Sequence, residues 1–203
     1  MNSAVVNRPS PEKRLRRAVG LVAVLNLTYF CVEFAVALTI GSVSLFADSI
    51  DFLEDTSVNC LILVALGWSS RWRARVGMAL SGILLAPGLA TLWTAWGKFV
   101  APVPPEPLPL SLTGAGAFAI NLTCALVLAG YRHQSGSLTK AAFLSARNDV
   151  FANLAIIAAG LLTAYSFSVW PDLIVGLGIA AINADAARKV WLAAKKEHLT
   201  AEA

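Results

Sequence analysis

The chain has 203 residues, of which 57% are hydrophobic and only 14% are charged, with a formal net charge of +4. Soluble domains carry about 25% charged residues, so this composition excludes an ordinary soluble protein and favours an integral membrane protein. The length provides for about six membrane-spanning helices of about 20 residues each and leaves no room for a second, soluble domain.

Lysine and arginine are clustered at alternate connections between the apolar runs. A first cluster ends at Arg17 and a second is centred on Arg73. The third group consists of Arg132 and Lys140, and a fourth begins at Arg188. This alternation is the positive-inside pattern, which predicts that both termini are cytoplasmic. A nucleic-acid-binding surface would need its charges on one continuous face, so we expect no nucleic-acid partner.

The apolar runs predict an all-α integral membrane protein with six transmembrane helices. The first run is too long for the apolar part of a cleavable signal peptide, and no small-residue cleavage site follows it, so we expect it to remain as a span. In chain order, the expected helices cover residues 18–40, 43–67, 77–98, 110–131, 141–166 and 172–192.

These helices define the expected domain organisation. Residues 1–17 form a basic cytoplasmic segment, residues 18–192 form the six-helix transmembrane domain, and residues 193–203 form a short cytoplasmic tail. We expect the two ends of the chain, residues 1–12 and 197–203, to be disordered.

The connections between the expected helices differ in composition. Gly41 and Ser42 predict a tight turn between the first two helices. Residues 101–109 are rich in proline, which lacks an amide proton and clashes with the preceding helical turn, so they predict a short external loop. Residues 132–140 are polar and predict a cytoplasmic link between the fourth and fifth helices.

The third expected helix contains a proline and several small residues. Pro87 predicts a kink or a local distortion. Gly82, Gly88 and nearby alanines provide a surface for close helix packing. Such a surface serves either a homodimer formed through transmembrane helices or packing within one chain, and the sequence does not choose between them.

Three cysteines, Cys31, Cys60 and Cys124, fall within the expected spans. An odd number of scattered thiols argues against a disulfide framework. Their ordinary role is that of small apolar packing groups. A role for Cys124 as a soft metal ligand is the alternative.

Four acidic residues of the second expected helix lie in the segment FADSIDFLEDTSVN, residues 46–59. A carboxylate at membrane depth costs about 3 kcal/mol on insertion scales, so such residues are seldom left without a partner. Residues four apart in a helix differ by about 40° around its axis. Asp51 and Asp55 therefore share one face, Asp48 lies one turn away on nearly the same stripe, and Glu54 points further round.

Polar residues of the fifth expected helix provide a matching face. Ser145, Asp149 and Asn153 are spaced by four residues, and Asn148 flanks them. Two helices that each contribute two oxygen ligands can form a four-coordinate site of the size that Zn²⁺ prefers.

These two faces predict a divalent-metal site formed by Asp51, Asp55 and Asp149, with Ser145, Asn148 and Asn153 as candidates to complete it. Carboxylates crowded in this way repel one another unless several are protonated or a cation lies between them. The alternative is therefore a hydrogen-bond network of protonated acids. Because protons compete with the metal for the carboxylates, the site has the physical basis for metal/proton exchange.

Other acids lie along the expected spans. We expect Glu33 in the first helix, Asp48 in the second and Asp185 in the sixth to line an ion pathway. For Glu33 and Asp185 the alternatives are an ion pair with Arg147 or hydrogen bonds between helices.

The chain resembles the cation diffusion facilitator family of divalent-metal efflux transporters. The resemblance rests on Asn26, on Glu33, on the segment GSVSLFADSIDFLED, residues 41–55, and on PDLIVGLGIAA, residues 171–181. It extends over about residues 18–192 and implies that Asp51 and Asp55 are the second-helix ligands. The family's fifth-helix pair is an aspartate preceded four residues earlier by a histidine or aspartate, which corresponds to Asp149 and Ser145.

Two departures from the family pattern affect the expected function. Ser145 replaces a strong ligand, so water, Asn148 or Asn153 would complete the shell, and oxygen-only ligation would move the preference from zinc toward cobalt or manganese. The family's cytoplasmic metal-binding domain has no counterpart in the sequence, so we expect dimerisation, if it occurs, to rest on membrane helices.

The sequence therefore predicts a transporter and not an enzyme. We expect a multi-pass protein of the bacterial inner membrane that exports a divalent metal from the cytoplasm in exchange for protons. The metal is its substrate, from the class of zinc, cobalt, cadmium and manganese with zinc or cobalt expected first, and no organic cofactor is expected. The alternative is a non-transporting membrane subunit that binds metal or a partner. An intramembrane hydrolase is disfavoured because the chain has no nucleophile motif and no glycine-rich phosphate loop.

Overall fold

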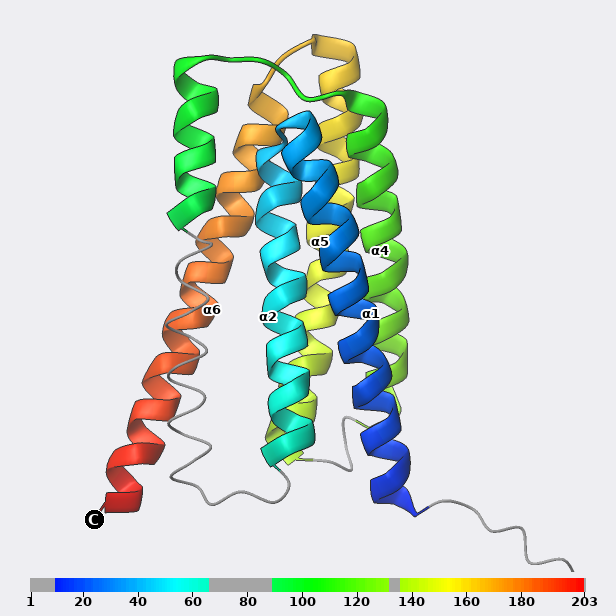
Figure 1. Cartoon of the computed structure of the whole chain (residues 1–203), viewed down its shortest axis with the longest axis vertical. Helices are drawn as coiled ribbons and strands as arrows, with labels where there is room; N and C mark the ends of the chain where they lie inside the picture. Colours follow the sequence, from blue (N-terminus) through cyan, green and yellow to red (C-terminus); the bar gives the residue numbers. More distant parts are fainter. Residues whose placement is uncertain (1–9, 66–88, 132–135, 203) are drawn as a thin grey trace, which may run out of the picture.

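The computed structural model describes residues 10–65, 89–131 and 136–202, and these residues are almost entirely helical. The helices pack side by side in one bundle (Figure 1). Residues 89–100 are also helical, and no strand occurs in these ranges. The bounds of the labelled helices are α1, Pro11–Ile40; α2, Val43–Ala65; α4, Pro107–Ala129; α5, Gly136–Ser166; and α6, Trp170–Glu202.

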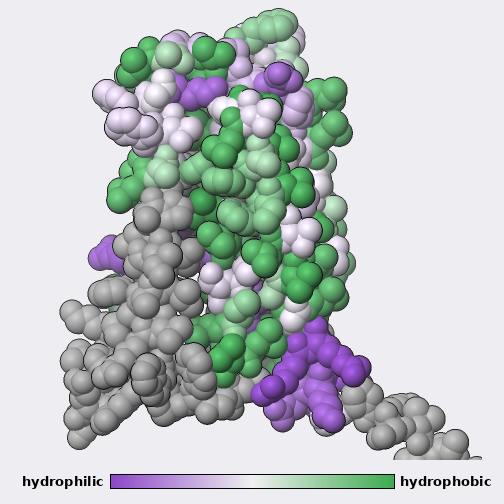
Figure 2. Space-filling model, viewed as in Figure 1, coloured by the Kyte–Doolittle hydropathy of each residue, from purple (hydrophilic) through white to green (hydrophobic). Residues whose placement is uncertain are grey.

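This architecture confirms the predicted all-α membrane fold. Within the described residues, three helical stretches are long and apolar enough to cross a membrane: Glu12–Ile40, Pro107–Ala129 and Ala142–Ser166. Large apolar side chains cover the outside of the bundle, as expected for a surface in contact with lipid, and a hydrophilic patch marks the start of α1 (Figure 2). The cytoplasmic location of both termini stays a prediction.

The helix ends differ from the prediction in several places. The expected disorder is wrong for residues 11–12, because Ser10 caps α1 by accepting a hydrogen bond from the Lys13 amide and Pro11 fits the first turn. It is also wrong for residues 197–202, which continue α6. Residues 136–140 belong to α5 and not to a polar link.

Smaller differences concern the middle of the chain. Helix α4 begins at Pro107 and not at residue 110, because proline is tolerated in the first turn of a helix. The third expected helix is confirmed for residues 89–98. Its first part, with Pro87 and the glycines of the small-residue surface, lies outside the described residues.

The turn between α1 and α2 is tight, as predicted. Gly41 adopts the left-handed conformation, with a φ of 63°, which glycine tolerates without strain. The Ser42 amide donates to the Ala37 carbonyl at 3.0 Å and so completes the end of α1.

Asp172 connects this turn to α6. Its buried carboxylate accepts hydrogen bonds from the Val43 amide at 2.8 Å, the Ser44 amide at 3.1 Å and the Ser42 hydroxyl at 2.6 Å. A carboxylate placed at the amide end of a helix satisfies free N–H groups and interacts favourably with the helix dipole. An acid from α6 thereby caps α2, and the two helices are held in register.

Candidate metal-transport site

Helix α2 occupies the centre of the bundle, where it contacts α1, α4, α5 and α6. Its acidic residues therefore face other helices instead of lipid. Asp48 and Asp55 are buried, and Asp51 and Glu54 are half-buried. The predicted ligands of α5 lie on the helix that packs against the same part of α2.

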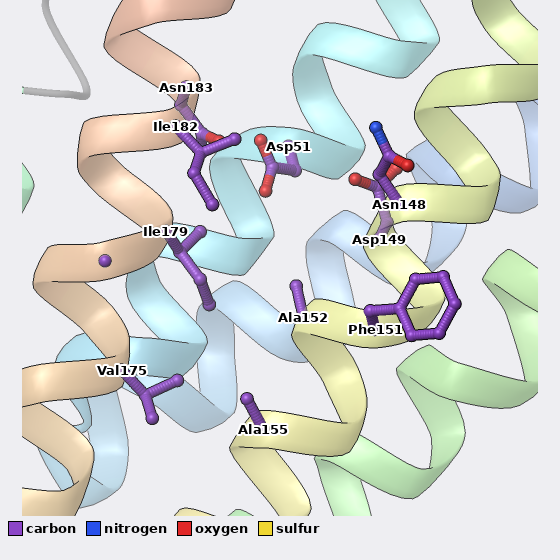
Figure 3. Close-up of a pocket in the computed structure, with 11 residues that line it drawn as sticks. Asp51, Asn148, Asp149, Phe151, Ala152, Ala155, Val175, Ile179, Ile182 and Asn183 are labelled. Carbon is purple, nitrogen blue, oxygen red and sulfur yellow. The ribbon is translucent and has the colours of Figure 1, made fainter.

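A cavity of about 360 Å³ opens between α2, α5 and α6. Asp51, Asn148 and Asp149 lie at its polar end, and aliphatic side chains such as Ile179 line the remainder. Figure 3 shows the carboxylates of Asp51 and Asp149 at the same end of this cavity, on opposite helices. Two of the predicted ligands therefore meet around one open space.

Asp55 lies beside this cavity and is held by neutral hydrogen-bond donors. Its Oδ1 accepts from the Ser145 hydroxyl at 3.0 Å, and its Oδ2 accepts from Asn26 Nδ2 at 3.4 Å. The Cys124 thiol in turn donates to Asn26 Oδ1 at 3.3 Å. Ser145 therefore lies against the acidic face of α2, as predicted. In this structure, however, its hydroxyl donates a hydrogen bond to a carboxylate instead of offering its oxygen to a metal ion.

The three predicted carboxylates are close enough to repel one another. Asp51 interacts electrostatically with Asp149 and Asp55, and Asp149 interacts with Asp55. In the part of the chain that the structure describes, however, no three acidic, histidine or cysteine side chains converge on one point. A bound cation would require Asp55 to turn from its donors toward Asp51 and Asp149.

Asn153 and Asp48 form a second polar group, nearer the α1–α2 turn, and Asp48 also interacts electrostatically with Asp51 and Asp149. Asn153 Nδ2 donates to Asp48 Oδ2 at 2.6 Å, and Asn121 Nδ2 donates to Asn153 Oδ1 at 3.0 Å. Glu33 is buried next to Asp48. Both polar atoms of Asn153 are therefore engaged away from Asp149, although the two residues lie on the same face of α5.

The remaining predicted residues are more exposed. Asn148 is exposed and accepts a hydrogen bond from Arg147 Nη2 at 3.4 Å. The alternative of an ion pair between Glu33 and Arg147 is wrong, because no basic side chain of the described residues reaches either oxygen of Glu33. Asp185 lies on an exposed part of α6 and does not line the cavity.

The sequence favours hydrogen bonding between helices for Asn121, which its bond to Asn153 confirms, but it did not assign the specific partners of Asn26, Asn121 and Asp172. Asn26 and Glu33 are seven residues apart on one face of α1, and this spacing was the available signal for Asn26. The other two hydrogen-bond across helices, so no spacing within one helix reveals their partners. Cys31 and Cys60 are exposed on the bundle surface, and Cys124 is buried.

Comparison with known families identifies the fold. Residues 19–194 match the model of the cation efflux transmembrane domain. The chain belongs to this family. Members of the cation efflux family are membrane transporters of metal cations, so the resemblance noted from the sequence is confirmed. No curated protein sequence matches the chain.

Proposed function

We propose that this cation efflux protein exports a divalent metal cation from the cytoplasm in exchange for protons, with Asp51, Asp55 and Asp149 as ligands. One observation carries the proposal: carboxylates from two packed helices interact around a cavity in the membrane-spanning bundle. Acids at this depth are costly unless they are partnered. A divalent cation neutralises two of them and is the natural partner.

The donor set suggests which metals the site would accept. The carboxylates provide oxygen, as do Ser145 and Asn148 when they complete the shell, and no histidine or thiolate lies among them. Oxygen donors suit Mn²⁺ and Mg²⁺, whereas imidazole and thiolate favour zinc. We therefore place manganese and cobalt ahead of zinc and cadmium as substrates. Asn153 is not part of the proposed shell because Asp48 and Asn121 occupy its amide.

Proton exchange follows from the chemistry of these ligands. A carboxylate must lose its proton before it binds a metal ion, so metal loading releases protons and proton binding expels metal. Alternating exposure of the site would come from movement of α5 and α6 against α2, because the cavity lies between these helices.

The transport experiment uses the purified chain in liposomes that enclose a metal-sensitive dye. We expect Mn²⁺ or Co²⁺ uptake that is driven by an outward proton gradient. Asp51→Asn and Asp149→Asn should reduce the rate by about 100-fold or more, because each removes a charged ligand without changing size. Glu54→Gln is the comparison on the same helix, because it removes a charge that interacts with Asp51 and Asp149 but removes no proposed ligand. Equal rates for Asp51→Asn and Glu54→Gln would refute the proposed site.

A second candidate function is a non-transporting membrane subunit that binds metal or a partner. The observation that favours it is the hydrogen bond from Ser145 to Asp55, which occupies a proposed ligand where the family has a stronger donor. The same liposomes separate the two functions, because metal binding without flux would identify a binding subunit. Flux abolished by Asp149→Asn would identify a transporter.

We also propose that the protein resides in the bacterial inner membrane and forms a homodimer through its membrane helices. The large apolar side chains on the bundle surface support both a lipid environment and helix packing between copies. Cross-linking in native membranes, followed by mass determination in detergent, tests the dimer, and a purely monomeric species would refute it.

A further inference from the structure

A second pair of acids, Glu33 on α1 and Asp48 on α2, is buried outside the cavity of the first site. Both side chains have 0% exposure, and neither residue lines that cavity. Their carboxylates face each other at close range. Asp48 lies one helical turn nearer the α1–α2 turn than Asp51, so the pair is displaced along the bundle from the proposed transport site.

Apart from the contact of the two acids with each other, three oxygens of this pair receive no hydrogen bond from any described residue. Glu33 Oε1, Glu33 Oε2 and Asp48 Oδ1 are buried without a partner in the described part of the chain. Asn121, whose amide donates to Asn153, also has a buried oxygen, Oδ1, without a partner. Buried polar atoms are nearly always satisfied in folded proteins, so such a concentration of free acceptors calls for a ligand.

The surrounding residues hold these acceptors in place without satisfying them. Asn153 Nδ2 binds Asp48 Oδ2 at 2.6 Å and leaves Oδ1 free, and Asn121 fixes Asn153 at 3.0 Å. Tyr29 lies one turn before Glu33 on α1, but its hydroxyl donates to the Thr113 carbonyl at 2.6 Å. The Asn153 amide and the Tyr29 hydroxyl are therefore engaged by acceptors other than the free oxygens of this pair.

We propose that Glu33 and Asp48 form a second cation-binding site, which takes a hard divalent cation such as Mn²⁺. Two carboxylates balance its charge, and the free oxygens provide the ligands that hard cations prefer. One proton shared between the carboxylates would serve only two of the free oxygens, whereas a metal ion coordinates several at once. Binding here does not depend on transport. If the protein exports the ion as proposed above, the ion would pass this site after Asp51 and Asp149, and only this order depends on the proposed function.

The test counts Mn²⁺ ions bound to the purified full chain in detergent by electron paramagnetic resonance. We expect about two ions per chain, whose spectrum is broadened by their mutual magnetic interaction. Glu33→Gln combined with Asp48→Asn should remove one ion and the broadening. Asp51→Asn combined with Asp149→Asn should remove the other ion. Glu54→Gln should leave both in place.

A charge-retaining variant guards against a loss of folding in the neutral variants. Glu33→Asp keeps the charge but withdraws the carboxylate by one methylene, so we expect about tenfold weaker binding of one ion and unchanged binding of the other. Size-exclusion elution and circular dichroism should match those of the unmodified chain.

Two results would overturn the second site: a single ion per chain that the Glu33 variants leave unaffected, or equal affinity in Glu33→Asp and the unmodified chain. The two sites fail separately. If Asp51→Asn with Asp149→Asn removes no ion while Glu33→Gln with Asp48→Asn removes one, the second site stands and the proposed transport site is refuted.

Discussion

Helices α2 and α6 approach each other closely at Gly176, and the substitution Gly176→Ala tests how these helices are held together. A Cβ atom at this position would lie 2.7 Å from the Ser44 nitrogen and 2.7 Å from the Val43 carbonyl carbon. Both are backbone atoms, which cannot turn aside as a flexible side chain would. Restoring ordinary contact at about 3.5–4 Å requires the helices to separate by about 1 Å.

Two costs add when the helices separate. Overpacking of this kind costs about 1–3 kcal/mol. The same displacement lengthens the hydrogen bonds from the Val43 and Ser44 amides to Asp172, now 2.8 and 3.1 Å, and each contributes about 1 kcal/mol. We expect Gly176→Ala to lower the free energy of unfolding by about 3 kcal/mol, or about 100-fold in the equilibrium constant.

Reversible unfolding in mixed micelles with increasing dodecyl sulfate, followed by circular dichroism, measures this change. Gly178→Ala is the matched control, because a Cβ atom there has nothing within 4 Å and alanine favours a helix over glycine by up to about 1 kcal/mol. The control should be as stable as the unmodified chain or slightly more so. Free energies of unfolding within about 0.5 kcal/mol of each other for the two variants would refute the account of the α2–α6 contact.

Three further predictions concern acids and their partners. Asp172→Asn should lower the free energy of unfolding by about 3 kcal/mol, because an amide group in place of one oxygen leaves a buried donor of the turn unsatisfied. In the same assay, Glu106→Gln at an exposed helix start should change it by less than about 0.5 kcal/mol. Ser145→His should raise Zn²⁺ affinity by about tenfold or more in calorimetry, because it supplies a nitrogen ligand beside Asp55, and an unchanged affinity would contradict the assignment. Metal affinity should fall as the pH is lowered, because protons compete with the metal for the ionised carboxylates. The Asp51→Asn variant should release about one proton fewer per metal bound than the unmodified chain, and equal proton release would exclude Asp51 as a ligand.

The sequence was sufficient to predict the fold because apolar run length and helix-breaking residues decide where spans begin and end. The αL turn at Gly41 and the proline-rich loop before α4 are where these signals place them. The missed parts are helix ends. The prediction ended each helix where its apolar run ends. Helix α6 continues past that point, because residues 193–202 are rich in alanine, lysine and glutamate, which favour a helix regardless of hydropathy.

The candidate site was predictable only as far as helical periodicity extends. Periodicity brings Ser145 and Asp149 to the face of α5 that meets Asp51 and Asp55. It does not determine which donor binds which oxygen, because that depends on how far each helix is rotated and shifted against its neighbour. Asn153 illustrates this limit, since it shares the face of Asp149 but its amide binds Asp48.

The number of donors around each buried acid offers a physical criterion for its role. Asp172 accepts hydrogen bonds from two backbone amides and two hydroxyls, so its charge is satisfied by the protein and it has no need of a cation. Asp55 accepts from two neutral side chains and can exchange them for a metal ion. Glu33 has no neutral donor among the described residues and contacts only the neighbouring acid Asp48. The affinity of these carboxylates for added metal should therefore rise as their protein donors become fewer, which makes Asp172 the structural acid of the three and Glu33 the one that most requires a ligand.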